Sequence, residues 1–233
     1  MTNVEHHLDD VEQERAPPLA LFDELIVKPP VIQDQRQLWE HQQRYIDAIM
    51  ACPHRRILVV LPTGGGKTTI AATIIKQYGR ETKPGIFIVH LREIVQQASD
   101  RLKEEGIAHG IIMAGEPYQP QQRVQTCSIQ TLHPRLFRRG MEKPDAAVIF
   151  VDEAHRVNAR TYQEILDEYP DAKIIGLTAT PCRGDGNGLG GTFETMIDLV
   201  QVQELIDKGI LVKTKVYAAL TADLKGVKID QGD

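Results

Sequence analysis

The sequence is poor in cysteine, poor in aromatic residues and without long apolar runs, and each shortage excludes a class of protein. Three of its 233 residues are cysteine, and no two have the Cys-x-x-Cys spacing of zinc ribbons or redox sites. The longest apolar runs, such as Ile57–Leu61, have about five residues, whereas a membrane helix needs about 20. An acidic N-terminus without an apolar stretch is not typical of a signal peptide. We therefore expect a protein of the reducing cytoplasm with no membrane partner.

A surplus of positive charge is also missing, because the net charge is −5 at pH 7. The negative charge is concentrated in the first 24 residues, which hold seven acidic side chains and one basic side chain. The rest of the chain is close to neutral, which leaves room for a local basic surface. The pairs Pro17-Pro18 and Pro29-Pro30 disfavour regular structure. We therefore expect residues 1–30 to form an acidic, proline-containing tail.

From about residue 36 onward, short apolar segments alternate with segments of helical periodicity. We count five or six apolar segments of strand length. Short strands that are apolar throughout are typical of a parallel sheet covered by helices on both faces, so the sequence predicts an α/β fold with a mostly parallel sheet. The predicted strands are Ile57–Leu61, Gly85–His90, Arg123–Ile129, Ala146–Val151 and Ile174–Thr178, and the predicted helices include Thr68–Tyr78, Arg92–Glu104 and Tyr162–Tyr169.

A glycine-rich segment connects the first of these strands to a helix, which is the context that a phosphate-binding loop requires. Its glycines allow successive backbone N–H groups to point at phosphate oxygens, and the helix N-terminus adds a positive dipole end. Lys67 is predicted to reach the β- and γ-phosphates of a nucleotide, and the Thr68 hydroxyl to ligate Mg²⁺. The strict pattern has a further glycine where this chain has Leu61, so a simple glycine turn is the alternative for this segment alone. The predicted nucleotide-binding residues of the loop are Thr63, Gly64, Gly65, Gly66, Lys67, Thr68 and Thr69.

A pair of carboxylates, Asp152 and Glu153, directly follows the apolar run Val148–Val151. The carboxyl end of a parallel strand lies at the sheet edge where such folds bind ligands, so the pair can face the glycine-rich loop. We expect Asp152 to hold Mg²⁺, directly or through water, and Glu153 to polarise the attacking water as a general base. Taken alone, the pair could be a solvated helix start, because acidic residues favour helix N-termini. The glycine-rich loop earlier in the chain makes the catalytic interpretation the better one.

Together these residues resemble the superfamily 2 helicases and translocases. Asp152-Glu153-Ala154-His155 is similar to the DEAH form of motif II, and Pro62–Thr68 is similar to motif I, which in this family commonly lacks the first glycine. Thr178-Ala179-Thr180 is similar to motif III. The resemblance extends over about residues 36–215 and is greatest for the RadD- and XPB-like branch, which includes many phage and bacterial DEXH proteins.

The resemblance implies that residues 31–215 form a RecA-like P-loop NTPase domain that binds ATP and Mg²⁺ and hydrolyses ATP. It implies that Gln42 lies in the adenine-reading region and that His155, Thr178 and Thr180 couple the nucleotide state to nucleic acid. It also implies contacts to the backbone of DNA or RNA from two segments similar to motif Ia and to a later strand-to-helix segment. The candidates in these segments are Arg92, Gln130 and Thr131.

A local basic cluster follows the second of these segments and adds Arg135 to the nucleic-acid candidates. The cluster comprises Arg135, Arg138, Arg139 and Lys143. Phosphates favour such patches, whereas a solvated helix face is the alternative. With five Phe, six Tyr and one Trp, no platform for base stacking is evident in the sequence. The pattern therefore favours backbone tracking over base-specific recognition.

In the resembled family, ATP lies between two RecA-like domains, and the second domain supplies an arginine finger. No motif of that kind is found here, and 53 residues follow Thr180, too few for a second RecA-like domain. Val202–Val212 is similar to the family segment that leads towards the second domain, so we expect residues 216–233 to begin a linker. We therefore expect a fragment or half of a split enzyme that binds ATP, hydrolyses it weakly or not at all alone, and has a second RecA-like domain as its partner in cis or in trans.

Two alternatives from other classes stay open at this point. The chain could be a nucleotide-gated module that binds nucleic acid or protein without hydrolysing ATP. It could also be another P-loop NTPase, such as a kinase or a GTPase. The order of the three motifs disfavours this second alternative, and the Asn-Lys-x-Asp motif that reads guanine is absent.

Overall fold

A computed structural model describes residues 38–80, 83–157, 159–180 and 189–213. The expected tail at residues 1–30 and the expected linker at residues 216–233 lie outside the described residues. Within the described ranges, no helix is both long and apolar enough to cross a bilayer.

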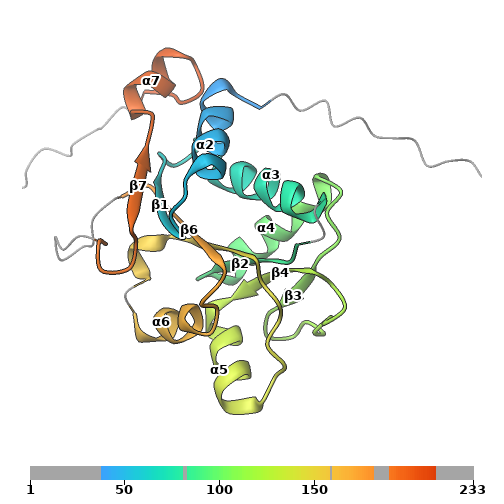
Figure 1. Cartoon of the computed structure of the whole chain (residues 1–233). Helices are drawn as coiled ribbons and strands as arrows, with labels where there is room; N and C mark the ends of the chain where they lie inside the picture. Colours follow the sequence, from blue (N-terminus) through green and yellow to red (C-terminus); the bar gives the residue numbers. More distant parts are fainter. Residues whose placement is uncertain (1–37, 81–82, 158, 181–188, 214–233) are drawn as a thin grey trace, which may run out of the picture. The chain divides into compact units, whose positions relative to one another are not determined.

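The described strands form one sheet in the order β3-β4-β2-β5-β6-β1-β7, and every neighbouring pair is parallel (Figure 1). The parallel α/β fold that the sequence predicts is therefore confirmed. The sheet has seven strands rather than five or six, and the two strands that are not among the predicted segments, the three-residue β3 and the four-residue β7, lie at its two edges. The strands are β1 (Arg56–Val60), β2 (Gly85–Val89), β3 (Gly110–Ile112), β4 (Val124–Ser128), β5 (Val148–Asp152), β6 (Lys173–Thr178) and β7 (Thr195–Asp198).

Helices cover both faces of the sheet, as the apolar strands require (Figure 1). Side chains of α2, α3 and α4 share one hydrophobic cluster with the sheet, and side chains of α5 and α6 share the other. The described helices are α2 (Glu40–Ala51), α3 (Lys67–Arg80), α4 (Arg92–Glu104), α5 (Ile129–Arg139), α6 (Arg160–Asp167) and α7 (Val202–Asp207), with a short 3₁₀ turn η1 (Ala154–Arg156).

The two clusters divide the side chains of each inner strand by the alternation of the pleat. On β1, Ile57 and Val59 belong to the cluster beneath α2 and α3, whereas Leu58 and Val60 belong to the cluster beneath α5 and α6. All four side chains are buried. Because β1 buries side chains on both faces, apolar residues are favoured at each of these positions, which explains the uninterrupted run in the sequence.

The order of the strands determines where the functional segments meet. Strand β6 lies between β1 and β5, so the loop after β1, the end of β6 and the end of β5 are neighbours at one edge of the sheet. The register places Val60 opposite Thr178 and Leu177 opposite Asp152. Since all three strands are parallel, their carboxyl ends open to the same side.

Candidate active site

The three segments that carry the predicted chemistry meet at this carboxyl edge. The loop after β1 holds the glycines and Lys67, β5 ends at Asp152, and β6 ends at Thr178. The backbone N–H of Leu61 donates to the carbonyl of Thr178 over 2.9 Å, which joins the start of the loop directly to the end of β6. The structure therefore brings together segments that lie more than 80 residues apart in the sequence.

Backbone geometry explains the glycines of the β1–α3 loop. Gly64 and Gly66 have φ angles of 82° and 96°, in the region that only glycine enters freely. A Cβ atom on Gly66 would lie 2.2 Å from Nε2 of Gln42, and one on Gly64 would lie 2.8 Å from Cδ2 of Leu211. The loop therefore accepts no side chains at these positions. It presents a backbone cradle of the kind that binds phosphate oxygens.

Helix α2 holds this loop from one side through two consecutive buried residues. Nε2 of His41 donates to the carbonyl of Gly65 over 2.8 Å, and Nε2 of Gln42 donates to the same carbonyl over 3.4 Å. Oε1 of Gln42 also accepts from the backbone N–H of Trp39 over 3.1 Å, so the amide links the start of α2 to the loop. The sequence pointed to Gln42 but missed His41, whose only signal is its position beside the glutamine.

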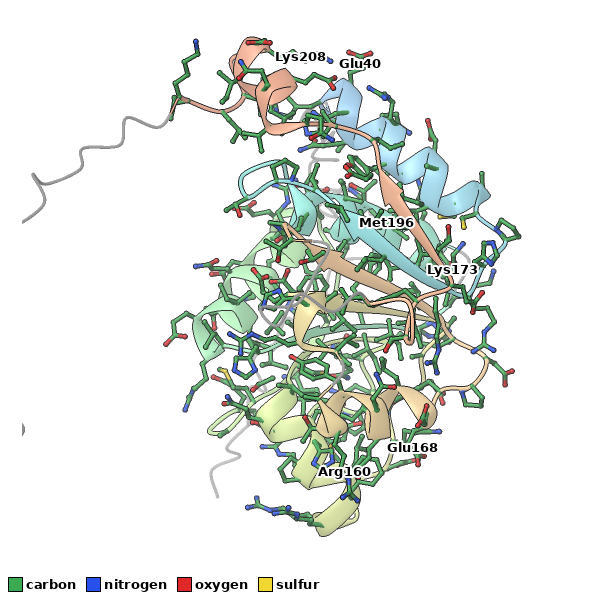
Figure 2. The ribbon with its side chains drawn as sticks, turned by 90° about the vertical axis from the view of Figure 1, so that its left-hand side faces the viewer. Glu40, Arg160, Glu168, Lys173, Met196 and Lys208 are labelled. Carbon is green, nitrogen blue, oxygen red and sulfur yellow. The ribbon has the colours of Figure 1, made fainter. Side chains whose placement is uncertain are left out.

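The segment after α7 is far from α2 and from the β1–α3 loop in the sequence, but it contacts the same loop through Leu211. An ion pair of 3.3 Å between Nζ of Lys208 and Oε2 of Glu40 joins this segment to the start of α2 (Figure 2). The backbone N–H of Leu211 donates to the carbonyl of Leu205 in α7 over 3.0 Å. No sequence pattern indicates this contact, because the two segments meet only through the tertiary fold.

Helix α3 begins at Lys67, and its first turn presents the side chains that a nucleotide requires. Nζ of Lys67 donates to the carbonyl of Leu61 over 3.3 Å and has no acidic partner among the described residues. Thr68 and Thr69 follow in the first turn and are half-buried. The ammonium group therefore lies across the loop without a competing carboxylate. This arrangement fits a triphosphate, because a phosphate oxygen can replace a weakly held carbonyl.

The Asp152-Glu153 pair lies at the turn from β5 into η1. Burial raises the pKa of Asp152 above its ordinary value, and the neighbouring Glu153 carboxylate raises that pKa further, whereas a hydrogen bond from the Glu153 backbone N–H and the charge of Lys67 lower it. Glu153 has φ 51° and ψ 52° and is the one non-glycine residue with a positive φ in the described part of the chain. Backbone strain of this kind is frequent at functional sites.

The predicted coupling residues lie beside this pair. Nδ1 of His155 is 3.2 Å from Oε2 of Glu153. Thr178 is fully buried, and its hydroxyl both donates to the carbonyl of Thr180 over 2.9 Å and accepts the Thr180 N–H over 3.1 Å. The end of β6 is thus closed into a tight turn next to the loop and the carboxylates.

Mg²⁺ fits this donor set only together with phosphate. No group of three or more metal-ligating side chains occurs in the part of the chain that the structure describes. Thr68 and Asp152 offer a hydroxyl and a carboxylate oxygen, which are ligands that Mg²⁺ accepts. Mg²⁺ usually keeps several waters and binds substrate phosphates as well, so two protein ligands are sufficient.

The predicted nucleic-acid residues are distributed over α4 and α5. Arg92 is exposed and donates to the carbonyl of Ala114 over 3.1 Å, and Arg135 is half-buried and donates to the carbonyl of Met113 over 3.1 Å. Both guanidinium groups therefore contact the segment that follows β3.

The other sequence candidates of this region lie on α5 and beyond it. Thr131 is half-buried on α5, and Gln130 lines a cavity between α5 and α6. The basic cluster of the sequence is divided, because Lys143 donates to the carbonyl of Glu168 over 2.6 Å whereas Arg138 lines the same cavity as Gln130.

Comparison with known proteins gives three findings. Residues 35–183, more than half of the chain, match the protein family described as "Type III restriction enzyme, res subunit". The chain is 28% identical over 176 residues to the 51.5 kDa protein of Lactococcus phage (isolate 7-9), with 76% of this chain and 35% of that protein covered. It is 27% identical over 158 residues to the DNA 3'-5' translocase XPB2 of Sulfurisphaera tokodaii, with 67% of this chain and 34% of that protein covered. The chain therefore spans about a third of the length of these relatives.

Among solved structures, the chain is similar to the UvsW helicase from bacteriophage T4, with a TM-score of 0.58 and 17% sequence identity. The match covers 76% of this chain and 66% of that chain. At this identity the likeness shows a shared fold, and the shared fold agrees with the parallel sheet and its two helical layers.

Proposed function

We propose that this chain, which belongs to the family of the Type III restriction enzyme res subunit, is the ATP-binding motor domain of an ATP-dependent helicase or translocase. Its fold is that of the first RecA-like domain of superfamily 2 helicases. It hydrolyses ATP when a second RecA-like domain, in cis or in trans, completes the site. The domain binds the backbone of DNA or RNA.

One observation carries this proposal: the phosphate loop, the carboxylate pair and the Thr178–Thr180 turn end three adjacent parallel strands. A structural glycine turn does not need a lysine without an acidic partner among the described residues, a strained glutamate and a half-buried carboxylate beside it. The combination supports phosphoryl transfer to water, because that reaction requires a phosphate cradle, a metal ligand and a group that orients water.

Each residue has a stated task in this reaction. The backbone of the β1–α3 loop and Lys67 bind the β- and γ-phosphates, and Thr68 and Asp152 hold Mg²⁺. Mg²⁺ neutralises charge that develops on the phosphate oxygens. Glu153 accepts a proton from the water that attacks the γ-phosphorus. His155 contacts Glu153, so a movement of the 3₁₀ turn reaches the general base directly.

The experiment that tests the proposal measures binding of a fluorescent ATP analogue together with phosphate release, each with and without single-stranded DNA or RNA. We expect tight analogue binding with slow release from this chain alone. Absence of saturable analogue binding would overturn the proposal. Release that is fast without any further domain would contradict the requirement for a second RecA-like domain, and ATP binding that gates a partner without release under any condition would favour the nucleotide-gated module.

A further inference from the structure

A cavity of about 300 Å³ opens between α5 and α6, on the sheet face opposite α3. Its lining is rich in hydrogen-bond donors and cationic groups and contains no acidic residue. The polar residues of the lining that matter here are His90, Gln130, His133, Arg138, Arg156 and Tyr162. A cavity of this composition attracts an anion.

Two arginines of this lining carry charge that no carboxylate of the described residues neutralises. Arg138 and Arg156 are exposed and form no ion pair in that part of the chain. The nearby Glu164 is already engaged, since it pairs with His133 and with Arg160, which Figure 2 shows on α6. The two guanidinium groups are therefore available to a ligand.

Tyr162 supplies an independent sign of a ligand site. Its side chain is 2% exposed, yet its hydroxyl has no hydrogen-bond partner in the described structure. Burial raises the pKa of Tyr162 to about 12, so the hydroxyl stays protonated and can donate at neutral pH. Most buried polar groups are hydrogen-bonded, and an unpaired one calls for an explanation.

An aromatic surface adjoins the cavity. Phe137 on α5 is 43% exposed, and its ring centroid lies 4.9 Å from that of His133, which lines the cavity. Exposed rings beside a cationic groove are the elements with which proteins bind single-stranded nucleic acid, because each base can stack on a ring. The stacking surface that was not evident in the sequence is thus offered by one helix of the structure.

We propose that the α5–α6 cavity is a nucleotide subsite for single-stranded nucleic acid, in which Arg138, Arg156 and the Tyr162 hydroxyl bind one backbone phosphate and Phe137 stacks on a base. The inference rests on the proposed function, because it assigns a place to the strand that the motor domain binds.

The position of the cavity favours a strand over a free anion. His90 and Arg156 also line a second cavity, together with Asp152, Glu153 and His155. A phosphate bound by Arg156 therefore lies next to the turn that carries the general base. Arg156 connects the two cavities and follows His155 directly, so it is the residue through which strand binding reaches the catalytic pair.

The test measures the affinity of a fluorescein-labelled oligothymidylate by anisotropy, as a function of salt concentration. The double variant Arg138→Gln/Arg156→Gln is expected to bind about tenfold more weakly or worse, and its salt slope is expected to fall by about one. Tyr162→Phe is expected to lose about 3- to 10-fold, as one hydrogen bond would. Phe137→Ala is expected to lose about fivefold or more with the intact strand and nothing with an abasic strand.

Arg139→Gln is the matched control, because Arg139 is exposed and directly follows Arg138 but does not line the cavity. Its effect is expected to stay within about threefold, as for an exposed charge that salt screens. If Arg139→Gln weakens binding as much as Arg138→Gln, the site is a diffuse basic surface and the subsite is wrong.

Two further outcomes separate this inference from the proposed function. Each variant is also titrated with the fluorescent ATP analogue, whose affinity is expected to stay unchanged. If the double variant binds the strand as tightly as the wild-type chain does, the proposed subsite is wrong. The proposal of a motor domain is not affected by that result. Inorganic phosphate alone is titrated as well. If phosphate saturates the cavity and the double variant does not alter the affinity for the strand, the cavity is a site for free phosphate, and the proposed subsite is wrong.

Discussion

The nucleotide edge and the α5–α6 cavity lie on either side of the turn that carries Glu153, and they differ in how their polar groups are satisfied. At the nucleotide edge, His41, Gln42 and Lys67 all bind backbone carbonyls of the loop or of the residue that precedes it. In the cavity, the Tyr162 hydroxyl has no partner among the described residues. One region is held in its binding shape by the protein itself, and the other leaves donors for a ligand.

This difference shows two separate signs of a binding site: a loop that the protein holds in its binding shape, and a buried donor that has no partner. A loop that is held by buried side chains loses its conformational entropy during folding. A phosphate can therefore bind to it without a further loss of that entropy. An unpaired buried donor destabilises the fold, and a ligand that accepts its hydrogen bond removes this cost. Mutations of the loop glycines and of the α2 side chains that hold the loop should therefore damage both folding and binding, whereas mutations of the cavity donors should damage binding alone.

The largest effect is expected from Gly66→Ala. The substitution places a Cβ atom 2.2 Å from Nε2 of Gln42 at a φ of 96°, and a left-handed conformation costs about 1–2 kcal/mol for a residue with a side chain. We expect the free energy of unfolding to fall by at least about 2 kcal/mol and binding of the ATP analogue to be lost.

Gly79→Ala is the matched control for this substitution. Gly79 lies in α3, and nothing lies within 4 Å of its added Cβ. It should raise the free energy of unfolding by about 0.5–1 kcal/mol. Denaturant unfolding of both variants checks the pair, and equal effects would refute the role assigned to the close approach of Gln42.

Lys67→Ala should separate binding from folding at the nucleotide edge. The ammonium group donates only to the Leu61 carbonyl over 3.3 Å in this structure, so its removal should change the free energy of unfolding by less than about 1 kcal/mol. The affinity for the ATP analogue should fall by about 10- to 100-fold, because hydrogen bonds to charged groups contribute about 1.5–3 kcal/mol. Lys103→Ala, on the exposed side of α4, should leave that affinity unchanged. Retained affinity in Lys67→Ala would count against the site.

Glu153 allows strain and chemistry to be separated at one position. Glu153→Gly should raise the free energy of unfolding by up to about 1 kcal/mol, since glycine adopts φ 51° without the side-chain penalty. Glu153→Gln keeps the strain and should leave stability unchanged. Both variants should bind the ATP analogue normally and lose the slow phosphate release expected of the wild-type chain, because neither side chain accepts the proton of water. A Glu153→Gly variant that unfolds more easily would show that the turn is not strained.

The nucleotide edge could be predicted from the sequence because its residues are consecutive. The segments Thr63–Thr69 and Asp152–His155 each follow an apolar run, and parallel strands bring their ends to one edge whatever their order. The identity of the neighbouring strand β6 could not be deduced, since strand order depends on long-range packing. The contact of Leu211 with Gly64 depends on the same packing and left no local signal.

The cavity could not be predicted, because its residues are scattered over four segments and follow no spacing rule. Arg138 was visible as part of a basic cluster, but the cluster also held Lys143, which the structure binds to a backbone carbonyl. Tyr162 had no signal in the sequence beyond its place at the start of the predicted helix Tyr162–Tyr169, and its side chain is buried. Only the structure shows that its hydroxyl lacks a partner.

Three buried tyrosines provide the most direct test of the comparison. The Tyr45 hydroxyl donates to the Val60 carbonyl over 2.6 Å and accepts the Leu199 N–H over 2.9 Å, and the Tyr169 hydroxyl donates to the Pro144 carbonyl over 2.9 Å. Removing either hydroxyl should lower the free energy of unfolding by about 1–3 kcal/mol, because a buried partner is left unsatisfied.

Tyr162→Phe should behave in the opposite way. Its hydroxyl has no hydrogen-bond partner in the described structure, so its removal leaves no other group unsatisfied. The free energy of unfolding should therefore stay the same or rise by up to about 1 kcal/mol. Urea unfolding of the three phenylalanine variants compares them under one condition. Equal destabilisation by Tyr162→Phe and Tyr169→Phe would mean that the Tyr162 hydroxyl is satisfied within the fold. The cavity would then be complete without a ligand, and the contrast between the two sides of the Glu153 turn would disappear.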